Sequence, residues 1–311
     1  MVKHINRQIL AIAVPAIIAN ITTPLLSIVD VTIVGHLGSD AFLAAIAIGG
    51  SMFNMLYWLF GFLRMGTSGL TAQAFGANDA NAQALTLYRA ILMAFAAGLI
   101  MILLHAPIAD ITLSFMDANT TTTQLAREYF SICIYGAPAV LGTYVLSGWF
   151  LGMQNSRAQM WISLVINVTN IVASLCLVYL LNLDITGVAC GTLTAQWIGL
   201  LTALILSRRY SIKRPTLKMI LRISELRRFF AVNTDIFLRT LCLVCVTVWF
   251  TRAGAQQSTI ILDVNTLLLQ LFMLFSYFMD GFAFAGEALC GRYAGARHEQ
   301  GLNRCIKTLL I

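Results

Sequence analysis

Charge is scarce in this 311-residue chain, since Asp, Glu, Lys and Arg together make up 11% of it while hydrophobic residues make up 59%. Soluble domains carry roughly 25% charged residues. The composition therefore excludes an ordinary soluble domain and favours a protein that crosses a membrane several times. The four histidines are far apart, and the C-x-x-C formed by Cys242 and Cys245 has no second pair near it. Metal-ligand spacing of the zinc type is thus missing as well.

Catalytic motifs are also missing from the sequence. It contains no Walker loop, no HExxH and no GxSxG nucleophile elbow. We therefore predict that the protein is not an enzyme and uses no cofactor, so that any transport would be secondary and independent of ATP. The first apolar run is too long for a cleavable signal peptide, and no small-residue cleavage site follows it.

What the chain does contain is a series of long apolar segments. A membrane helix needs roughly 20 apolar residues, and no alternation typical of a membrane β-barrel is present. We predict an all-α polytopic membrane protein with eight spans, and the start of a ninth at residues 304–311. The predicted spans are 9–36, 42–63 with a glycine-rich extension to about 75, 84–105, 124–151, 158–182, 185–207, 229–252 and 259–286.

The basic residues gather at one set of span ends. One side holds Lys3, Arg7, Arg64, Arg89, Arg157, the run 208–228 and the run 292–307. The other side holds only Arg127 and Arg252, together with Asp40, Asp110, Asp117 and Asp184. Positive charge concentrates on the cytoplasmic side of membrane proteins, so this pattern predicts a cytoplasmic N-terminus. It also explains the net charge of +7 without nucleic acid as a partner.

One long charged segment divides the spans. Residues 207–228 contain eight basic residues and one acid, Glu225. We predict three parts: a six-span lobe at 1–206, a basic cytoplasmic linker at 207–228 and an incomplete second lobe at 229–311. The linker fits either an amphipathic helix on an anionic inner leaflet or a solvated connector.

The two predicted lobes look like repeats of each other. GFLRMGTSGLTAQAFGAND, at the end of the second span, resembles YFMDGFAFAGEALCGRYAGARH, at the end of the eighth, with a register of 215 to 219 residues. Because both lobes start on the inner side, they would be parallel repeats. The second lobe would then need six spans, of which two are present, and we expect the chain to be truncated.

The first span carries an acid and two prolines. An ionisable group within a span costs at least about 2.5 kcal/mol on insertion scales, and a proline removes a backbone hydrogen bond and permits a bend. Asp30, Pro15 and Pro24 therefore fit two interpretations. The span is a bending element with a titratable acid, or the acid reaches the interface beside a packing kink.

Several of these segments together resemble the multidrug and toxic compound extrusion (MATE) transporters. They are the P-x14-D of the first span, IVGHLGSDAFLAA, the glycine-rich segment above, YGAPAVLGTYVLSGWFLGMQNSR and NVTNIVASLCLVYLLNLDITGVACGTLTAQ. NTDIFLRTL and YFMDGFAFAGEALCGR are similar to the DNA-damage-inducible (DinF) branch. The resemblance implies twelve helices in two lobes around a cleft. It also implies a monomer in a bacterial inner membrane that exchanges H+ or Na+ for cationic or amphiphilic compounds.

The resemblance also implies a cation site in the first lobe. Asp30 matches the acid of the first helix, Pro15 the bending proline, Asn170 and Thr192 polar ligands, and Tyr129 a site tyrosine. Helical rise places residue 174 and Thr192 both about 10 Å from the outer end, and Asn170 one turn deeper on the face of residue 174. Ser174 stands where some relatives have a second acid. One carboxylate among neutral oxygens suits a proton better than sodium, and burial disfavours its charged form. We hypothesise that Asp30 carries the proton.

Polar residues of the second lobe are weaker candidates. Asp235 and Arg239 are spaced i, i+4 and fit either a structural pair or a coupling role in the second lobe. Asp280 and Glu287 are two turns apart on one face and are predicted to line the inner mouth or to bind substrate cations. Gly148/Gly152 and Gly187/Gly191 are predicted helix-packing contacts. Two other functions remain open: a lipid-linked oligosaccharide flippase of the wider superfamily, and a membrane remnant that does not transport.

Overall fold

The computed structural model describes residues 5–35, 40–114, 119–210, 212, 215–222, 233–247, 249 and 259–310. All regular structure in these ranges is helical. The helices are α1 (Ile5–Gly35), α2 (Asp40–Leu59), α3 (Phe62–Gly76), α4 (Ala80–Leu103), α5 (His105–Ser114), α6 (Thr120–Cys133), η2 (Ile134–Gly136), α7 (Ala137–Gly152), α8 (Ser156–Leu175), η3 (Cys176–Leu180), α9 (Asp184–Ser207), α10 (Leu217–Ile220), α12 (Thr259–Gly295) and α13 (Glu299–Leu310). A further helix occupies residues 233–247.

The predicted spans correspond closely to these helices. Six helical stretches of the described residues are long and apolar enough to cross a membrane: Ile5–Thr22, Ala41–Gly76, Ala80–Leu103, Thr120–Gly152, Ser156–Leu180 and Asp184–Ser207. The helix at 233–247 and α12 follow where the seventh and eighth spans are predicted. The predicted outer end of the first span at His36, and linker residues 223–228, lie outside the described residues. The short helix α5 was not predicted, because its apolar residues continue the preceding run.

Side chains set several of the helix starts. The carboxylate of Asp79 accepts hydrogen bonds from the backbone N–H groups of Asn81 and Ala82, both at 3.0 Å, at the start of α4. Asn119 accepts one from the backbone of Thr122 at 2.8 Å, at the start of α6. Such caps satisfy N–H groups that the first helical turn leaves without partners. They fix where each span re-enters the bundle.

The first lobe packs around α7. Fourteen of its 16 residues are buried, among them Leu141, Trp149 and Phe150, which is the pattern of a helix surrounded by others. Gly148 and Gly152 lie against the backbone oxygens of Arg64 and Ser68 on α3. Gly187 packs on η3, and Gly191 packs on α8. The four predicted packing glycines are thus confirmed as close helix contacts.

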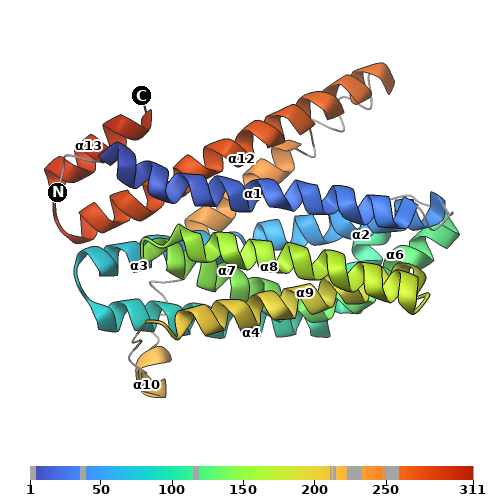
Figure 1. The fold of residues 1–311 in the computed structure, drawn as a ribbon, viewed down its shortest axis with the longest axis horizontal. Coiled ribbons are helices and arrows are strands. Elements are labelled where there is room, and N and C mark those ends of the chain that lie inside the picture. The colour runs from blue at the N-terminus through green and yellow to red at the C-terminus, as the bar shows by residue number, and fades with distance from the viewer. Residues whose placement is uncertain are drawn as a thin grey trace.

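The bundle is elongated along its helices (Figure 1). Both labelled termini, α13 and the turn between α3 and α4 lie at one end, and the turn between α8 and α9 lies at the other. α1 packs along α8 on one side and crosses α12 on the other. α12 also packs on α3. From this crossing, α12 diverges from α1 toward the opposite end (Figure 1). We call the end with the termini the inner end, in line with the predicted topology, and the opposite end the outer end.

Candidate functional site

A direct polar contact joins α8 to α9 within the bundle. The side-chain amide of Asn170 donates a hydrogen bond to the hydroxyl oxygen of Thr192 at 3.0 Å. Asn170 is buried, and its amide oxygen makes no hydrogen bond within the described part of the chain. A buried polar atom without a partner is costly in a protein interior. The pair therefore presents an oxygen that a proton donor or a cation would stabilise.

Tyr129 on α6 links this pair to the first helix. Its hydroxyl lies near the side chains of Thr192 and Cys133 and interacts electrostatically with Asp30. The ring is buried against Gly49 of α2, where even a methyl group would clash with it. Phe53 packs on the same ring edge-on, with centroids 6.4 Å apart. Packing therefore fixes the position of the tyrosine.

Asp30 itself lies in the second half of α1. Its side chain is partly buried, and its Oδ1 atom is buried and makes no hydrogen bond among the described residues. It interacts electrostatically with Cys133 as well as with Tyr129. A carboxylate in such a place must take up a proton or a cation, or else pay a desolvation cost. Pro15 is buried five residues before Asn20 at the middle of the helix, and α1 continues through both Pro15 and Pro24.

Ser174 occupies a different environment from the other predicted residues. It is fully buried, and its side chain and backbone lie against Gly191 of α9. Its hydroxyl oxygen has no hydrogen-bond partner in the described part of the chain. No group of three or more His, Cys, Asp or Glu side chains that could hold a metal ion occurs among the described residues. The cluster of Asp30, Tyr129, Asn170, Ser174 and Thr192 thus offers one carboxylate and several neutral oxygens.

A second polar cluster lies between α3 and α12. The guanidinium of Arg64 stacks over the ring of Phe284, with Cζ 3.9 Å from the ring centroid. The carboxylates of Asp280 and Glu287 both interact electrostatically with Arg64. One basic group of the first lobe therefore faces two acids of the second. The sequence singled out both acids but missed Arg64 as their partner, because no spacing along the chain relates them.

The predicted pair of Asp235 and Arg239 stays a prediction. Both side chains are exposed, and Arg239 interacts electrostatically with Asp280 on the neighbouring helix. No ion pair joins Asp235 to Arg239 in the part of the chain that the structure describes. Spacing along one helix brings two side chains within reach of each other, but it says nothing of a competing acid on another helix.

The lobes approach each other closely at the inner end. A Cβ atom built on Gly295 would lie 2.7 Å from the carbonyl carbon of Gln73, and one built on Gly76 would lie 2.8 Å from that of Arg292. One built on Gly291 would lie 2.7 Å from the Cβ of Ala72. α3 and α12 therefore meet backbone to backbone, with no room for side chains.

These contacts are reciprocal. Gly76 contacts Arg292, three positions before Gly295. Gly295 contacts Gln73, three positions before Gly76. The two glycines are 219 positions apart, and so are Asn78 and Arg297, which adopt the same left-handed backbone conformation at φ 56° and 53°. The structure thus selects 219 from the predicted range of registers. The paired FGAND and AGARH segments were the available signal for this contact.

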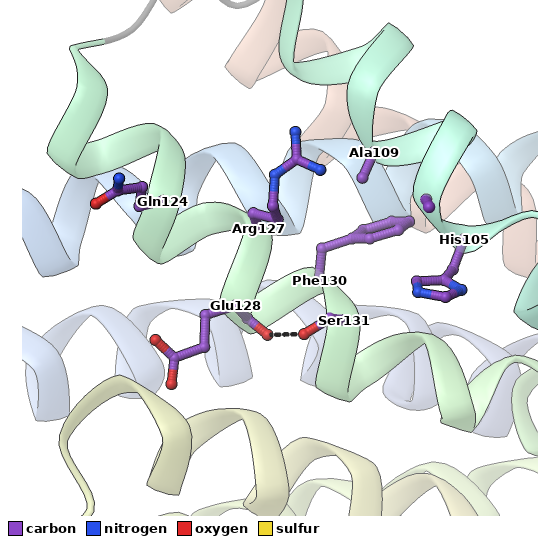
Figure 2. A pocket seen from close by; sticks show the side chains of 8 residues that line it. His105, Ala109, Gln124, Arg127, Glu128, Phe130 and Ser131 are labelled. Carbon is purple, nitrogen blue, oxygen red and sulfur yellow. Dashed lines mark hydrogen bonds between the residues drawn. The ribbon is translucent and has the colours of Figure 1, made fainter.

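A surface hollow of about 340 Å³ lies apart from both clusters, between α5 and α6 (Figure 2). Its charged side chains have partners: Arg127 pairs with Asp110 at 2.5 Å, and Glu128 accepts a hydrogen bond from Thr186 at 2.8 Å. The backbone oxygen of Glu128 accepts another from Ser131 (Figure 2). None of the predicted site residues lines it. Its polar groups are explained by the packing of the helix ends.

Comparison with protein families and curated proteins gives consistent matches. The MatE family model matches residues 15–176. DNA damage-inducible protein F of Escherichia coli is 39% identical over 290 residues, which are 92% of this chain and 63% of that protein. Protein DETOXIFICATION 44, chloroplastic, of Arabidopsis thaliana is 25% identical over 95% of this chain and 60% of its own length. The chain thus spans somewhat less than two thirds of these relatives.

Solved structures show the same fold. A crystal structure of MATE in the bent conformation superposes with a TM-score of 0.89 at 21% identity, over 98% of this chain and 69% of that one. A MOP superfamily transporter from Pyrococcus furiosus, described as having a binding pocket of reverse polarity, gives a TM-score of 0.87 at 21% identity, over 98% and 68% of the two chains.

Proposed function

Because the chain belongs to the MatE family, whose members are transporters rather than enzymes, we propose that it acts as a secondary antiporter. It exchanges H+ for cationic or amphiphilic organic compounds by alternating access. The family places it among multi-pass membrane proteins. Related curated proteins include a probable multidrug resistance protein, NorM, of Listeria monocytogenes, which is 26% identical over 56% of this chain and 38% of its own length.

One observation carries the coupling part of this proposal. Asp30 has a buried oxygen with no hydrogen-bond partner among the described residues. It lies near Tyr129, which in turn lies near the hydrogen-bonded pair of Asn170 and Thr192. Protonation removes the charge of such a carboxylate without any other ligand. A sodium ion would gain from a second formal charge, and the corresponding position holds Ser174. The carboxylate and its neutral neighbours therefore favour H+ over Na+ as the coupling ion.

The lobes supply the moving parts. We propose that residues 1–206 and 229–311 act as two lobes joined by the linker 207–228. The contact of α3 with α12 at the inner end closes that side, while α12 diverges from α1 toward the outer end (Figure 1). An outward-facing MATE structure, 22% identical, has a TM-score of 0.87 with this chain over 98% of its length and 68% of that chain. For transport to proceed, the inner contact must separate, and Pro15 is the proposed point of bending in α1.

The proposed setting is a bacterial inner membrane with the N-terminus in the cytoplasm. The basic side chains gather at the inner end, as the positive-inside rule requires. Lipid and a cationic or amphiphilic small molecule are the proposed partners, and a monomer is the proposed functional form.

The test is dye efflux from proteoliposomes with imposed gradients. We expect an outward movement of a cationic dye such as ethidium when a pH gradient is imposed, and none when only a sodium gradient is imposed. Efflux with sodium alone contradicts proton coupling but keeps the antiporter. No efflux with either gradient contradicts transport by this chain and favours a membrane remnant.

A further inference from the structure

The start of the basic linker is held against the first lobe. Tyr210 packs edge-on against Trp149 of α7, with centroids 5.1 Å apart, and lies 6.0 Å from Phe150. Its hydroxyl accepts a hydrogen bond from the side-chain amide of Asn155 at 2.8 Å. Ile212 then packs on the same core. The chain that leaves α9 is therefore anchored at the inner end.

A second anchor lies about ten residues further on. Arg89 of α4 donates hydrogen bonds to the backbone oxygens of Met219 and Ile220, at 2.8 and 3.2 Å. Carbonyl groups at the end of a helix have no partner within it, so the guanidinium caps the short helix α10. The side chain of Arg89 is only 8% exposed. α10 is consequently fixed beside α4 at the end of the bundle that holds both termini (Figure 1).

The exposed side chains of this anchored segment are apolar and basic. The side chains of Leu217, Met219 and Leu221 are 69%, 49% and 47% exposed. Lys218 and Arg222 are exposed between and beside them, and Arg208 and Arg209 are exposed at the end of α9. The described residues from 207 to 222 include no acid. The second anchor thus holds a short segment that carries three exposed apolar side chains and two positive charges, and Arg208 and Arg209 lie earlier, at the end of α9.

We propose that residues 216–222 form a docking surface for anionic phospholipids of the cytoplasmic leaflet. Apolar side chains flanked by basic ones bind at the boundary between head groups and acyl chains. Each basic residue near an anionic surface adds to that attraction. A lipid surface satisfies both features together, whereas a soluble acidic partner would leave the apolar side chains in water. The inference rests on the proposed cytoplasmic position of the inner end and is independent of transport.

Hydrogen–deuterium exchange of the protein in nanodiscs tests this directly. Amides of the segment hydrogen-bond to Thr216 and Leu217, so their exchange reports its stability. We expect exchange of residues 217–222 to slow at least about threefold when phosphatidylcholine is replaced by a mixture with phosphatidylglycerol. The turn at residues 181–184, at the other end of the bundle, serves as the internal reference and should not change.

Matched variants separate charge from packing. The double variant Lys218→Gln/Arg222→Gln should lose the effect of phosphatidylglycerol. Arg297→Gln, an exposed basic residue at the same end but off the segment, should keep it. Equal exchange in both lipids, or an undiminished lipid effect in the double variant, overturns the proposal. The proposal is also overturned if exchange of residues 217–222 slows only when a soluble protein is added. Because exchange is read without any gradient, a failure of dye efflux would leave this result unaffected.

Discussion

The inner end and the outer half of this bundle are held together by different means. At the inner end α3 and α12 meet backbone against backbone at Gly76 and Gly295, and Gly291 packs on Ala72. In the outer half α1, α6, α8 and α9 meet through Asp30, Tyr129, Asn170 and Thr192. A contact made by shape does not change with protonation. A contact made by polar groups changes with protonation, because each proton added or removed converts an acceptor into a donor or the reverse. The comparison therefore places the sensing of the coupling ion in the outer half and the mechanical closure at the inner end.

Asp30→Asn should produce the largest effect. An amide of nearly the same shape keeps the packing of α1 but cannot exchange a proton. We expect pH-driven dye efflux to fall to the level of empty liposomes, while the protein remains folded. Asp110→Asn is the matched control, since that acid pairs with Arg127 on the surface and such pairs contribute at most about 1 kcal/mol. Efflux retained by Asp30→Asn would move the sensing function away from the outer half.

Gly295→Ala tests the inner side of the comparison. The added methyl group would overlap the backbone of Gln73, and overpacking of a tight contact typically costs about 1–3 kcal/mol. We expect a lower Tm in detergent, and greater reactivity of a cysteine placed at Ala72 toward an aqueous reagent. Both changes report separation of α3 from α12.

The control for this variant lies on α3 itself. A Cβ built on Gly69 would meet no atom within 4 Å, and an alanine in a helix is favoured over glycine by roughly 1 kcal/mol. Gly69→Ala should therefore leave Tm unchanged or raise it. If both variants lower Tm equally, the loss reflects helix geometry in general and the inner contact has no special role.

Thr192→Val should have a smaller effect confined to the outer half. The substitution keeps the shape but removes the oxygen that accepts from Asn170. A hydrogen bond between neutral groups contributes about 1 kcal/mol. We expect a modest loss of stability and a shift in the pH at which efflux is half-maximal, because Asn170 loses its hydrogen-bond partner close to Tyr129 and Asp30. Thr194→Val on the same helix removes only an exposed hydroxyl bonded to the backbone of Cys190 and should leave that pH unchanged.

The sequence predicted the membrane spans well because apolar length is a local property of the chain. It did not predict the interruption between α2 and α3 at Phe60 and Gly61, where apolar residues continue without a break. Helical rise alone placed Thr192 level with Ser174, one turn beyond Asn170. In the structure, Thr192 is hydrogen-bonded to Asn170. The contacts of Arg64 with α12 arise only when two distant segments meet. Such contacts leave no periodic trace in a single sequence.

The smallest expected effect concerns the charges of the second lobe. Arg239 interacts electrostatically with Asp280, and Asp235 lies four residues earlier on its own helix. All three side chains are exposed, so solvent screening limits any coupling to about 0.5 kcal/mol. Double-mutant cycles built from Arg239→Gln with Asp280→Asn, and from Arg239→Gln with Asp235→Asn, measure the two couplings as changes in Tm. We expect the first to be small but measurable and the second to be zero. The reverse order would show that spacing along one helix, rather than packing between helices, sets the partner of Arg239.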